Sequence, residues 1–177
     1  GGDSVGNTDD YIIKTAEKEK IDRKKKLDNI YYFLEEFIDC TEFNVSVLAG
    51  RNGAEVLPPA EMIFSGYFND KPKIVGYKAK WDETSEEYKQ TNRAFGTLEN
   101  EPELNEKLIE VCRKLWKALN LKGYVRVDFR VDKNNQIFIL EINGNPCISP
   151  DSGFVAAVEY MGYTVDEMVK RIIQDLN

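Results

Sequence analysis

The side chains of Asp128, Glu141 and Asn143 are the strongest candidates for chemistry in this sequence. Carboxylate and amide oxygens are hard ligands, the kind that suits Mg²⁺ when phosphate oxygens and water complete its coordination shell. All three lie in a stretch where two segments of alternating apolar residues, 124–131 and 137–142, flank a polar connection. This pattern predicts a β-hairpin, which would bring the three side chains together.

The register of this hairpin decides which side chains meet. A four-residue turn at 133–136 would place Asp128 opposite Glu141 and Arg126 opposite Asn143 on one face. On the other face, the same register pairs Val127 with Ile142, Phe129 with Leu140, and Val131 with Phe138, so that face is apolar and belongs to a core. Two carboxylates directly across a ladder repel each other, and a divalent cation would compensate for that repulsion.

Two interpretations of the polar face remain open from the residues alone. The face is either a metal site or a solvated surface on which Arg126 and Arg130 neutralise the acids. The absence of histidine narrows the chemistry further. It excludes Ser–His and Cys–His nucleophile pairs and most zinc sites, which leaves carboxylates, lysines, arginines and backbone amides.

The composition indicates an ordinary globular domain. The chain has 177 residues, of which 42% are hydrophobic and 11% aromatic, enough for a real core. A net charge of −7 argues against a nucleic-acid scaffold. We find neither a membrane-length apolar run nor a secretion signal. The three cysteines, Cys40, Cys112 and Cys147, favour free thiols, and we therefore expect a cytoplasmic protein.

Other elements are expected to position the hairpin. Strands are predicted at 29–37, 42–48, 54–57, 60–64 and 73–81, and helices at 8–27, 102–120, 153–161 and 165–176. In the strand at 73–81, Lys78 and Lys80 would share one face, where they are either solvated or available to a phosphate. The polar stretch 82–99 is predicted to be a surface loop with at most a helical turn.

The chain begins with three glycines in its first six residues. Their backbone amides could wrap an anion, although glycine-rich termini are also common leftovers of cloning. A domain that begins on such a loop suggests a piece of a longer protein.

Several short motifs follow one another along the chain. They are Gly2-Asp3-Ser4-Val5-Gly6, Glu35-Glu36-Phe37-Ile38, Glu42-Phe43-Asn44-Val45, Leu57-Pro58-Pro59-Ala60-Glu61, Lys78-Ala79-Lys80-Trp81, Arg126-Val127-Asp128-Phe129, Glu141-Ile142-Asn143-Gly144-Asn145-Pro146 and Ser149-Pro150-Asp151-Ser152-Gly153-Phe154. In this order, over nearly the whole chain, they resemble the ATP-grasp superfamily and, within it, the D-alanine–D-alanine ligase-like carboxylate–amine ligases. The Arg-x-Asp and Glu-x-Asn-x-x-Pro pair is the most specific part.

The resemblance implies an α+β fold. It would be the ATP-grasp carboxy-terminal lobe, a mainly antiparallel sheet flanked by helices, together with the end of the preceding nucleotide-binding lobe. Residues 1–38 would form the end of the first lobe, and residues 39–177 the carboxy-terminal lobe. Because the family's substrate domain and the start of its nucleotide-binding lobe are missing from this sequence, we expect the chain to be inactive by itself.

The resemblance also implies a reaction. A carboxylate would attack the γ-phosphate of ATP, and an amine would capture the resulting acylphosphate to form an amide or peptide bond. The expected cofactors are ATP and two Mg²⁺ ions, for which Mn²⁺ could substitute. The expected partners are small carboxylates and amines of the amino-acid or dipeptide class, with no nucleic acid and no membrane, and a homodimer is compatible with them. The alternative is an Mg-ATP-binding module without ligase activity that acts as a sensor or partner domain.

Metal and substrate roles follow from the resemblance position by position. The metal ligands would be Asp128, Glu141 and Asn143, with Glu141 bridging two ions. Arg126 would stabilise the oxyanion of the tetrahedral adduct. Ser152 would bind the carboxylate of the acceptor.

Nucleotide-binding roles follow in the same way for residues Gly2, Ser4, Val5, Gly6, Glu35, Phe37, Ile38, Glu42 and Lys80. The loop of glycines would cover the phosphates, and Glu35, with the backbone at 37–38, would meet adenine. Glu42 would hold the ribose hydroxyls, and Lys80 would contact the terminal phosphate.

Three positions depart from the family pattern: Asp3, Trp81 and Cys147. Cys147 stands where these ligases usually have glycine, and without a base nearby it indicates a structural variation rather than a nucleophile. Because the departures line the acceptor side, the resemblance does not assign D-alanine as the substrate.

Overall fold

The computed structural model describes residues 36–51, 53–66 and 72–176. The chain forms two compact units by its internal contacts. One unit comprises residues up to Asp39 together with Phe64–Asn92, and the other comprises Cys40–Ile63 together with Arg93–Asn177. No helix within the described ranges is long and apolar enough to cross a membrane.

Several sequence predictions fall outside the described residues. They are the glycine-rich loop with Gly2, Ser4, Val5 and Gly6, the helix at 8–27, Glu35, and the strand at 29–37 up to residue 35. At 36–39 the backbone has no regular secondary structure.

An antiparallel sheet is the basis of the larger unit. The strands are β1 (Thr41–Gly50), β2 (Gly53–Val56), β3 (Ala60–Phe64), β4 (Thr91–Ala94), β5 (Tyr124–Val131) and β6 (Ile137–Asn143), and the helices of this unit are α4 (Pro102–Ala118), α5 (Gly153–Tyr160) and α6 (Val165–Leu176). Along the sheet the strand order is β4-β3-β1-β5-β6, and β2 pairs with β1. The pairings of β1 with β2, β3 and β5, and of β5 with β6, are antiparallel, which confirms the expected sheet type.

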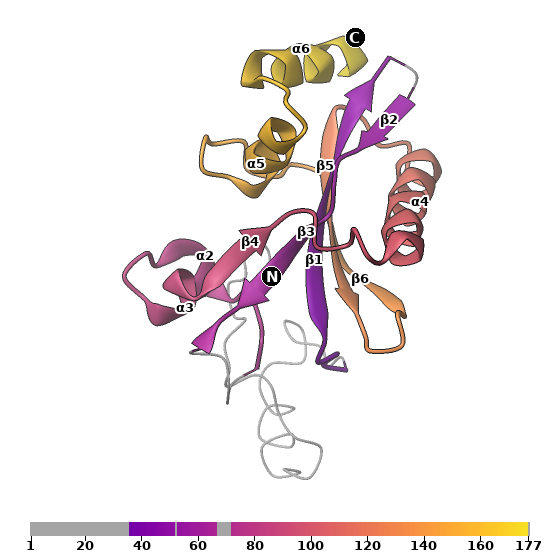
Figure 1. Cartoon of the computed structure of the whole chain (residues 1–177). Coiled ribbons are helices and arrows are strands. Elements are labelled where there is room, and N and C mark those ends of the chain that lie inside the picture. The colour runs from indigo at the N-terminus through magenta and orange to yellow at the C-terminus, as the bar shows by residue number, and fades with distance from the viewer. Residues whose placement is uncertain (1–35, 52, 67–71, 177) are drawn as a thin grey trace, which may run out of the picture. The chain divides into compact units, whose positions relative to one another are not determined.

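The two faces of the sheet belong to different hydrophobic cores, because side chains alternate along a strand. Odd-numbered residues of β1 and β5, such as Val45 and Phe129, pack with α4. On the opposite face, Leu48 and Tyr124 pack with α5 and α6. Figure 1 shows α4 on one side of β5, with α5 and α6 on the other.

Local sequence signals set the helix ends in this unit. Proline occupies the first turn of α4, where its missing N–H leaves no intrahelical bond unmade. At the start of α6, the Thr164 hydroxyl accepts a hydrogen bond from the Glu167 N–H at 3.2 Å, while the Glu167 carboxylate accepts one from the Thr164 N–H at 2.8 Å. This reciprocal pair of hydrogen bonds is a capping box, and it fixes the start of α6.

The β5–β6 register agrees with the prediction at one end of the hairpin only. The pairs Arg126–Asn143, Val127–Ile142 and Asp128–Glu141 are as predicted. A β-bulge follows, and the next pairs are Phe129–Ile139, Arg130–Phe138 and Val131–Ile137, not the predicted Phe129–Leu140 and Val131–Phe138. Leu140 is 49% exposed and does not join the core.

The hairpin turn accounts for this shift. The Asp132 N–H donates to the Gln136 carbonyl at 3.0 Å, so the turn is the three residues 133–135 rather than four. Asn135 takes a left-handed conformation with φ of 58°, as three-residue hairpin loops require. The Asp132 carboxylate accepts the Asn134 and Gln136 N–H groups at 2.8 and 2.9 Å. The shorter turn moves the register by one residue, and the bulge compensates for it.

In the smaller unit, the prediction of a strand at 73–81 is wrong. Residues 72–76 have no regular structure, and helix α2 (Tyr77–Trp81) follows. Tyr77 is 50% exposed while Ala79 is buried, whereas a strand would place both on one face. In a helix, residues two apart point about 200° from each other. Lys78 and Lys80 therefore do not share a strand face.

The stretch predicted as a loop at 82–99 contains regular structure. Helix α3 (Glu86–Lys89) begins after Ser85, whose hydroxyl accepts a hydrogen bond from the Tyr88 N–H at 3.1 Å. Strand β4 follows it directly. The predicted helical turn is present, but the strand was not anticipated.

Candidate functional site

A polar face is formed by the even-numbered residues of β1 and β5 together with the end of β6. Three rows cross these strands: Ser46–Arg126–Asn143, Asn44–Asp128–Glu141, and Glu42–Arg130. Neighbouring strands lie about 4.8 Å apart, so adjacent members of a row are within side-chain reach. The helices α5 and α6 cover this face at Leu48 and Tyr124. The charged rows begin directly beyond that covered end.

Asp128 is held by Arg126 from the same strand. The Arg126 Nε and Nη2 atoms donate to the two carboxylate oxygens at 2.7 and 2.8 Å, a bidentate ion pair. The two side chains are only 18% and 8% exposed. Burial by itself would lower the pKa of Arg126, but the hydrogen bond and charge of Asp128, with the charges of Glu141 and Glu42, raise that pKa above its ordinary value.

The ion pair matches one of the two interpretations left open by the sequence, in which arginine neutralises the acids. The strand register places Asp128 and Glu141 directly opposite each other on neighbouring strands, with Asn143 in the adjacent row. Within the described part of the chain, no three Asp, Glu or Cys residues are grouped as a metal cluster.

Glu42 and Arg130 form a second ion pair across β1 and β5. The Arg130 Nη2 lies 3.2 Å from the Glu42 Oε2, and the two side chains are 5% and 8% exposed. Arg130 has no predicted binding role. The signal was present, because the alternation of Glu42, Asn44 and Ser46 on β1 predicts a polar face that the arginines of β5 would meet.

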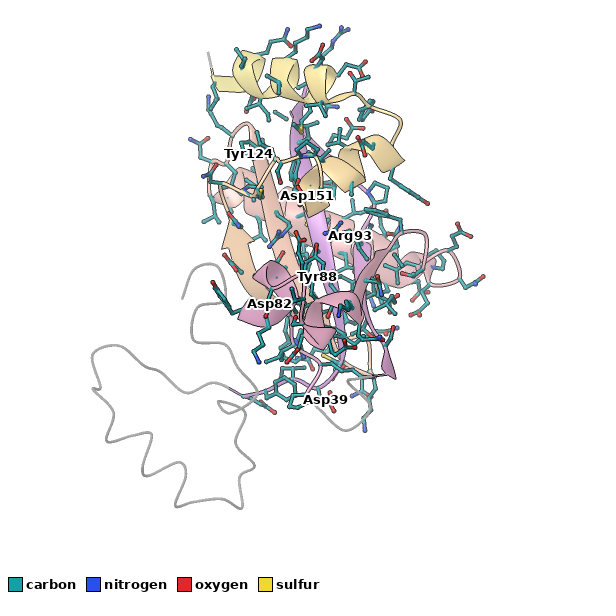
Figure 2. The ribbon with its side chains drawn as sticks, turned by 90° about the vertical axis from the view of Figure 1, so that its left-hand side faces the viewer. Asp39, Asp82, Tyr88, Arg93, Tyr124 and Asp151 are labelled. Atoms are coloured by element: carbon teal, nitrogen blue, oxygen red, sulfur yellow. The ribbon has the colours of Figure 1, made fainter. Side chains whose placement is uncertain are left out.

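The loop after β6 is attached to the polar face by hydrogen bonds. The side-chain oxygen Oδ1 of Asn143 accepts from the Asn145 N–H at 2.9 Å, and the Tyr124 hydroxyl donates to the side-chain oxygen of Asn145 at 2.7 Å. In Figure 2, Tyr124 and Asp151 both lie below α6, the yellow helix at the top. The loop therefore starts and ends beside the covered end of the face.

Ser152 lies at the end of this loop as the N-cap of α5. Its hydroxyl accepts a hydrogen bond from the Val155 N–H at 3.3 Å. Nearby, the Ser149 hydroxyl donates to Asp151 at 2.6 Å, and this hydrogen bond lowers the pKa of Asp151. Cys147 is exposed, and like Cys40 and Cys112 it is a free thiol, as predicted.

The structure brings together only part of the predicted site. Arg126, Asp128, Glu141, Asn143 and Glu42 share the polar face. Residues predicted to bind the nucleotide that belong to the other compact unit are Phe37, Ile38 and Lys80. Those that lie outside the described residues are Gly2, Ser4, Val5, Gly6 and Glu35.

A family model described as D-ala D-ala ligase C-terminus matches residues 1–174. The chain belongs to this family. The D-alanine–D-alanine ligase of Carboxydothermus hydrogenoformans is 31% identical over 165 residues, which cover 93% of this chain and 49% of the relative. The ligase of Aquifex aeolicus is 28% identical over 172 residues, which cover 97% of this chain and 52% of the relative. The chain thus spans about half the length of these curated relatives.

Solved structures of ligases share the fold. The D-alanine–D-alanine ligase of Bacillus anthracis complexed with ATP has a TM-score of 0.66 at 18% identity, over 90% of this chain and 46% of that chain. The D-alanyl-alanine synthetase A of Vibrio cholerae has a TM-score of 0.60 at 22% identity, over 80% of this chain and 40% of that one. These similarities confirm the expected ATP-grasp carboxy-terminal lobe of the D-alanine–D-alanine ligase family.

Proposed function

We propose that this chain is the Mg-ATP-binding, carboxy-terminal part of an ATP-dependent carboxylate–amine ligase. In the proposed reaction, a carboxylate attacks the γ-phosphate of ATP, and an amine displaces phosphate from the acylphosphate to form an amide or peptide bond. The observation that carries the proposal is the arrangement of Asp128, Glu141 and Asn143 beside Arg126 on one sheet face, within the fold of a ligase family.

The donor set fits Mg²⁺. Asp128 and Glu141 supply negative oxygens from neighbouring strands, and Asn143 supplies a neutral oxygen in the adjacent row. Oxygen ligands from one or two carboxylates, completed by phosphate and water, are typical of Mg²⁺ sites. When bound, Mg²⁺ would neutralise charge on the transferring phosphoryl group.

Arg126 would have two partners. It pairs with both oxygens of Asp128 through two of its five N–H groups, and each of these oxygens has a further acceptor position at which a cation could bind. The other N–H groups of the guanidinium could donate to a developing oxyanion on the substrate. Arg126 would keep its positive charge, because arginine side chains stay protonated in proteins.

The remaining roles are proposed from the family resemblance. Glu42 would accept hydrogen bonds from the ribose hydroxyls, and Lys80 would contact the terminal phosphate. Ser152 would bind the carboxylate of an amino-acid or dipeptide acceptor. Its place at the N-terminus of α5 supports this role, because helix N-termini favour anions.

The proposal extends to organisation and setting. Residues 1–38 would be the end of the first ATP-grasp lobe and residues 39–177 the carboxy-terminal lobe. A unit boundary after Asp39 supports this division, although Phe64–Asn92 groups with the first unit. We propose a cytoplasmic enzyme that acts on small molecules, with a homodimer as the assembly to test.

The test is ADP release by the protein that contains this chain, with panels of amino acids and dipeptides. Turnover with one carboxylate–amine pair, dependent on Mg²⁺, is the expected result. Tight Mg-ATP binding without turnover on any pair would instead favour the non-catalytic nucleotide-binding module. Absence of both binding and turnover would contradict the proposal.

A further inference from the structure

Glu42 and Arg130 are the most deeply buried charged pair on the polar face. They face each other across β1 and β5, and their closest atoms are 3.2 Å apart. Removing two charges from water is costly, and a buried ion pair is often no more stable than an apolar pair of similar volume. The pair is therefore expected to add little net stability. Its other effect is to hold the Glu42 carboxylate in one orientation.

We propose that Arg130 is a positioning residue that orients Glu42 for the ribose hydroxyls of the nucleotide. This inference rests on the proposed function, which assigns the ribose to Glu42. The Arg130 guanidinium holds one carboxylate oxygen, Oε2. An ionised carboxylate has about four acceptor positions, so a carboxylate that a guanidinium holds can in general also accept from hydroxyl groups.

The physical basis is pre-organisation. A glutamate side chain has several rotamers, and a hydrogen bond to a ligand must also compensate for restricting them. On β5, Arg130 lies in the row next to Asp128. It thus fixes the ribose acceptor on β1 relative to the proposed phosphate-binding residues in the neighbouring row. Its loss should weaken recognition of the ribose and leave recognition of the phosphates largely intact.

The test compares the dissociation constants of ATP and 2′-deoxy-ATP in the protein that contains this chain. The unaltered protein should prefer ATP by about tenfold, the value of one hydrogen bond to a charged group. Arg130→Met should reduce the preference to about twofold, and Glu42→Gln should reduce it as far. In the double variant, the preference should fall no further than in Glu42→Gln alone, because Arg130 acts through Glu42.

Arg130→Lys keeps the charge but replaces the planar fork by a single ammonium, so an intermediate preference of about threefold is expected. If Arg130→Met does not fold, which thermal unfolding would reveal, Arg130→Lys takes its place as the test variant. Arg113→Met, at an arginine of α4 that is 58% exposed, should leave the preference unchanged.

Two outcomes separate the inference from the function beneath it. If the Arg130 variants weaken ATP and 2′-deoxy-ATP by the same factor while Glu42→Gln abolishes the preference, Arg130 is merely structural and the inference is overturned. If Glu42→Gln also leaves the preference unchanged, the proposed ribose role of Glu42 fails, and the role of Arg130 fails with it.

Discussion

Strand β5 presents two faces made of alternate residues, and burial does not distinguish them. Val127 and Phe129 are at most 1% exposed on one face, while Asp128 and Arg130 on the other are only 6% and 4% exposed. The difference lies in the partners. The apolar residues contact hydrocarbon, including α4, whereas the charged residues have ion-pair partners. Hydrocarbon contacts stabilise the fold, while an ion pair can exchange one member for a charged ligand.

The largest effect on stability is expected on the apolar face. Phe129→Ala should lower the free energy of unfolding by about 3–5 kcal/mol, because a fully buried ring is lost and a cavity remains. Urea denaturation measures this change. The matched control is Ile139→Ala, opposite Phe129 on β6 but 46% exposed, which should cost less than about 1 kcal/mol. Equal losses at both positions would contradict the contrast.

Substitutions on the charged face are expected to change the affinity for Mg-ATP instead. Asp128→Asn keeps the shape of the side chain but removes its charge, and should weaken Mg-ATP binding by about 1.5–3 kcal/mol. Isothermal titration calorimetry measures this change. Glu110→Gln removes an exposed acid from α4 and should leave binding unaltered. Unchanged nucleotide binding in Asp128→Asn would mean that the acids of this face are structural.

Two helix caps sharpen the contrast between stability and function. Ser152 caps α5 and Thr164 caps α6, so replacing either by alanine should cost about 1 kcal/mol of stability. Only Ser152→Ala should also raise the KM for the acceptor, because the proposed function assigns the acceptor's carboxylate to that residue. Steady-state kinetics at saturating ATP, with thermal unfolding, separates the two effects. Equal KM values in the two variants would remove Ser152 from the site.

The smallest effect is expected at the hairpin turn. The backbone hydrogen bond from Gln136, with those from Asn134, lowers the pKa of Asp132 below its ordinary value near 3.8. This carboxylate therefore contributes stability above the unfolded-state pKa, and the contribution is lost as pH falls through the lower folded-state pKa. Asp132→Asn should flatten this part of the pH profile, measured by urea unfolding from about pH 5 to about pH 2. A profile identical to that of the unaltered protein would contradict the assignment.

The elements whose sequences have a strong hydrophobic periodicity could be predicted. The helix after Pro102 has apolar residues at helical spacing, and the hairpin has alternation on both strands, so their types were correct. Asp128, Glu141 and Asn143 came together as expected because the first part of the register was right. A resemblance over nearly the whole chain then suggested roles that spacing alone left open.

Features that depend on tertiary contacts could not be predicted. Strand β4 is four residues long and contains Asn92 and Arg93, so it has no apolar pattern from which a strand could be predicted. The segment at 77–81 is too short for its alternation to tell a strand from a helical turn. The Glu42–Arg130 pair joins residues 88 positions apart, and only the pairing of β1 with β5 brings them together.

Because of the bulge between Asp128 and Phe129, the pairing register of the polar rows is independent of the register at the turn end of the hairpin. A one-residue change in the turn would otherwise reverse which face every β6 side chain occupies, because a strand has a period of two. In this hairpin the bulge accommodates the one-residue change in register, and it lies between the turn and the pair Asp128–Glu141. The turn at 133–135 is therefore a place where chain length can vary, or where a peptide can be inserted, while the acids keep their alignment.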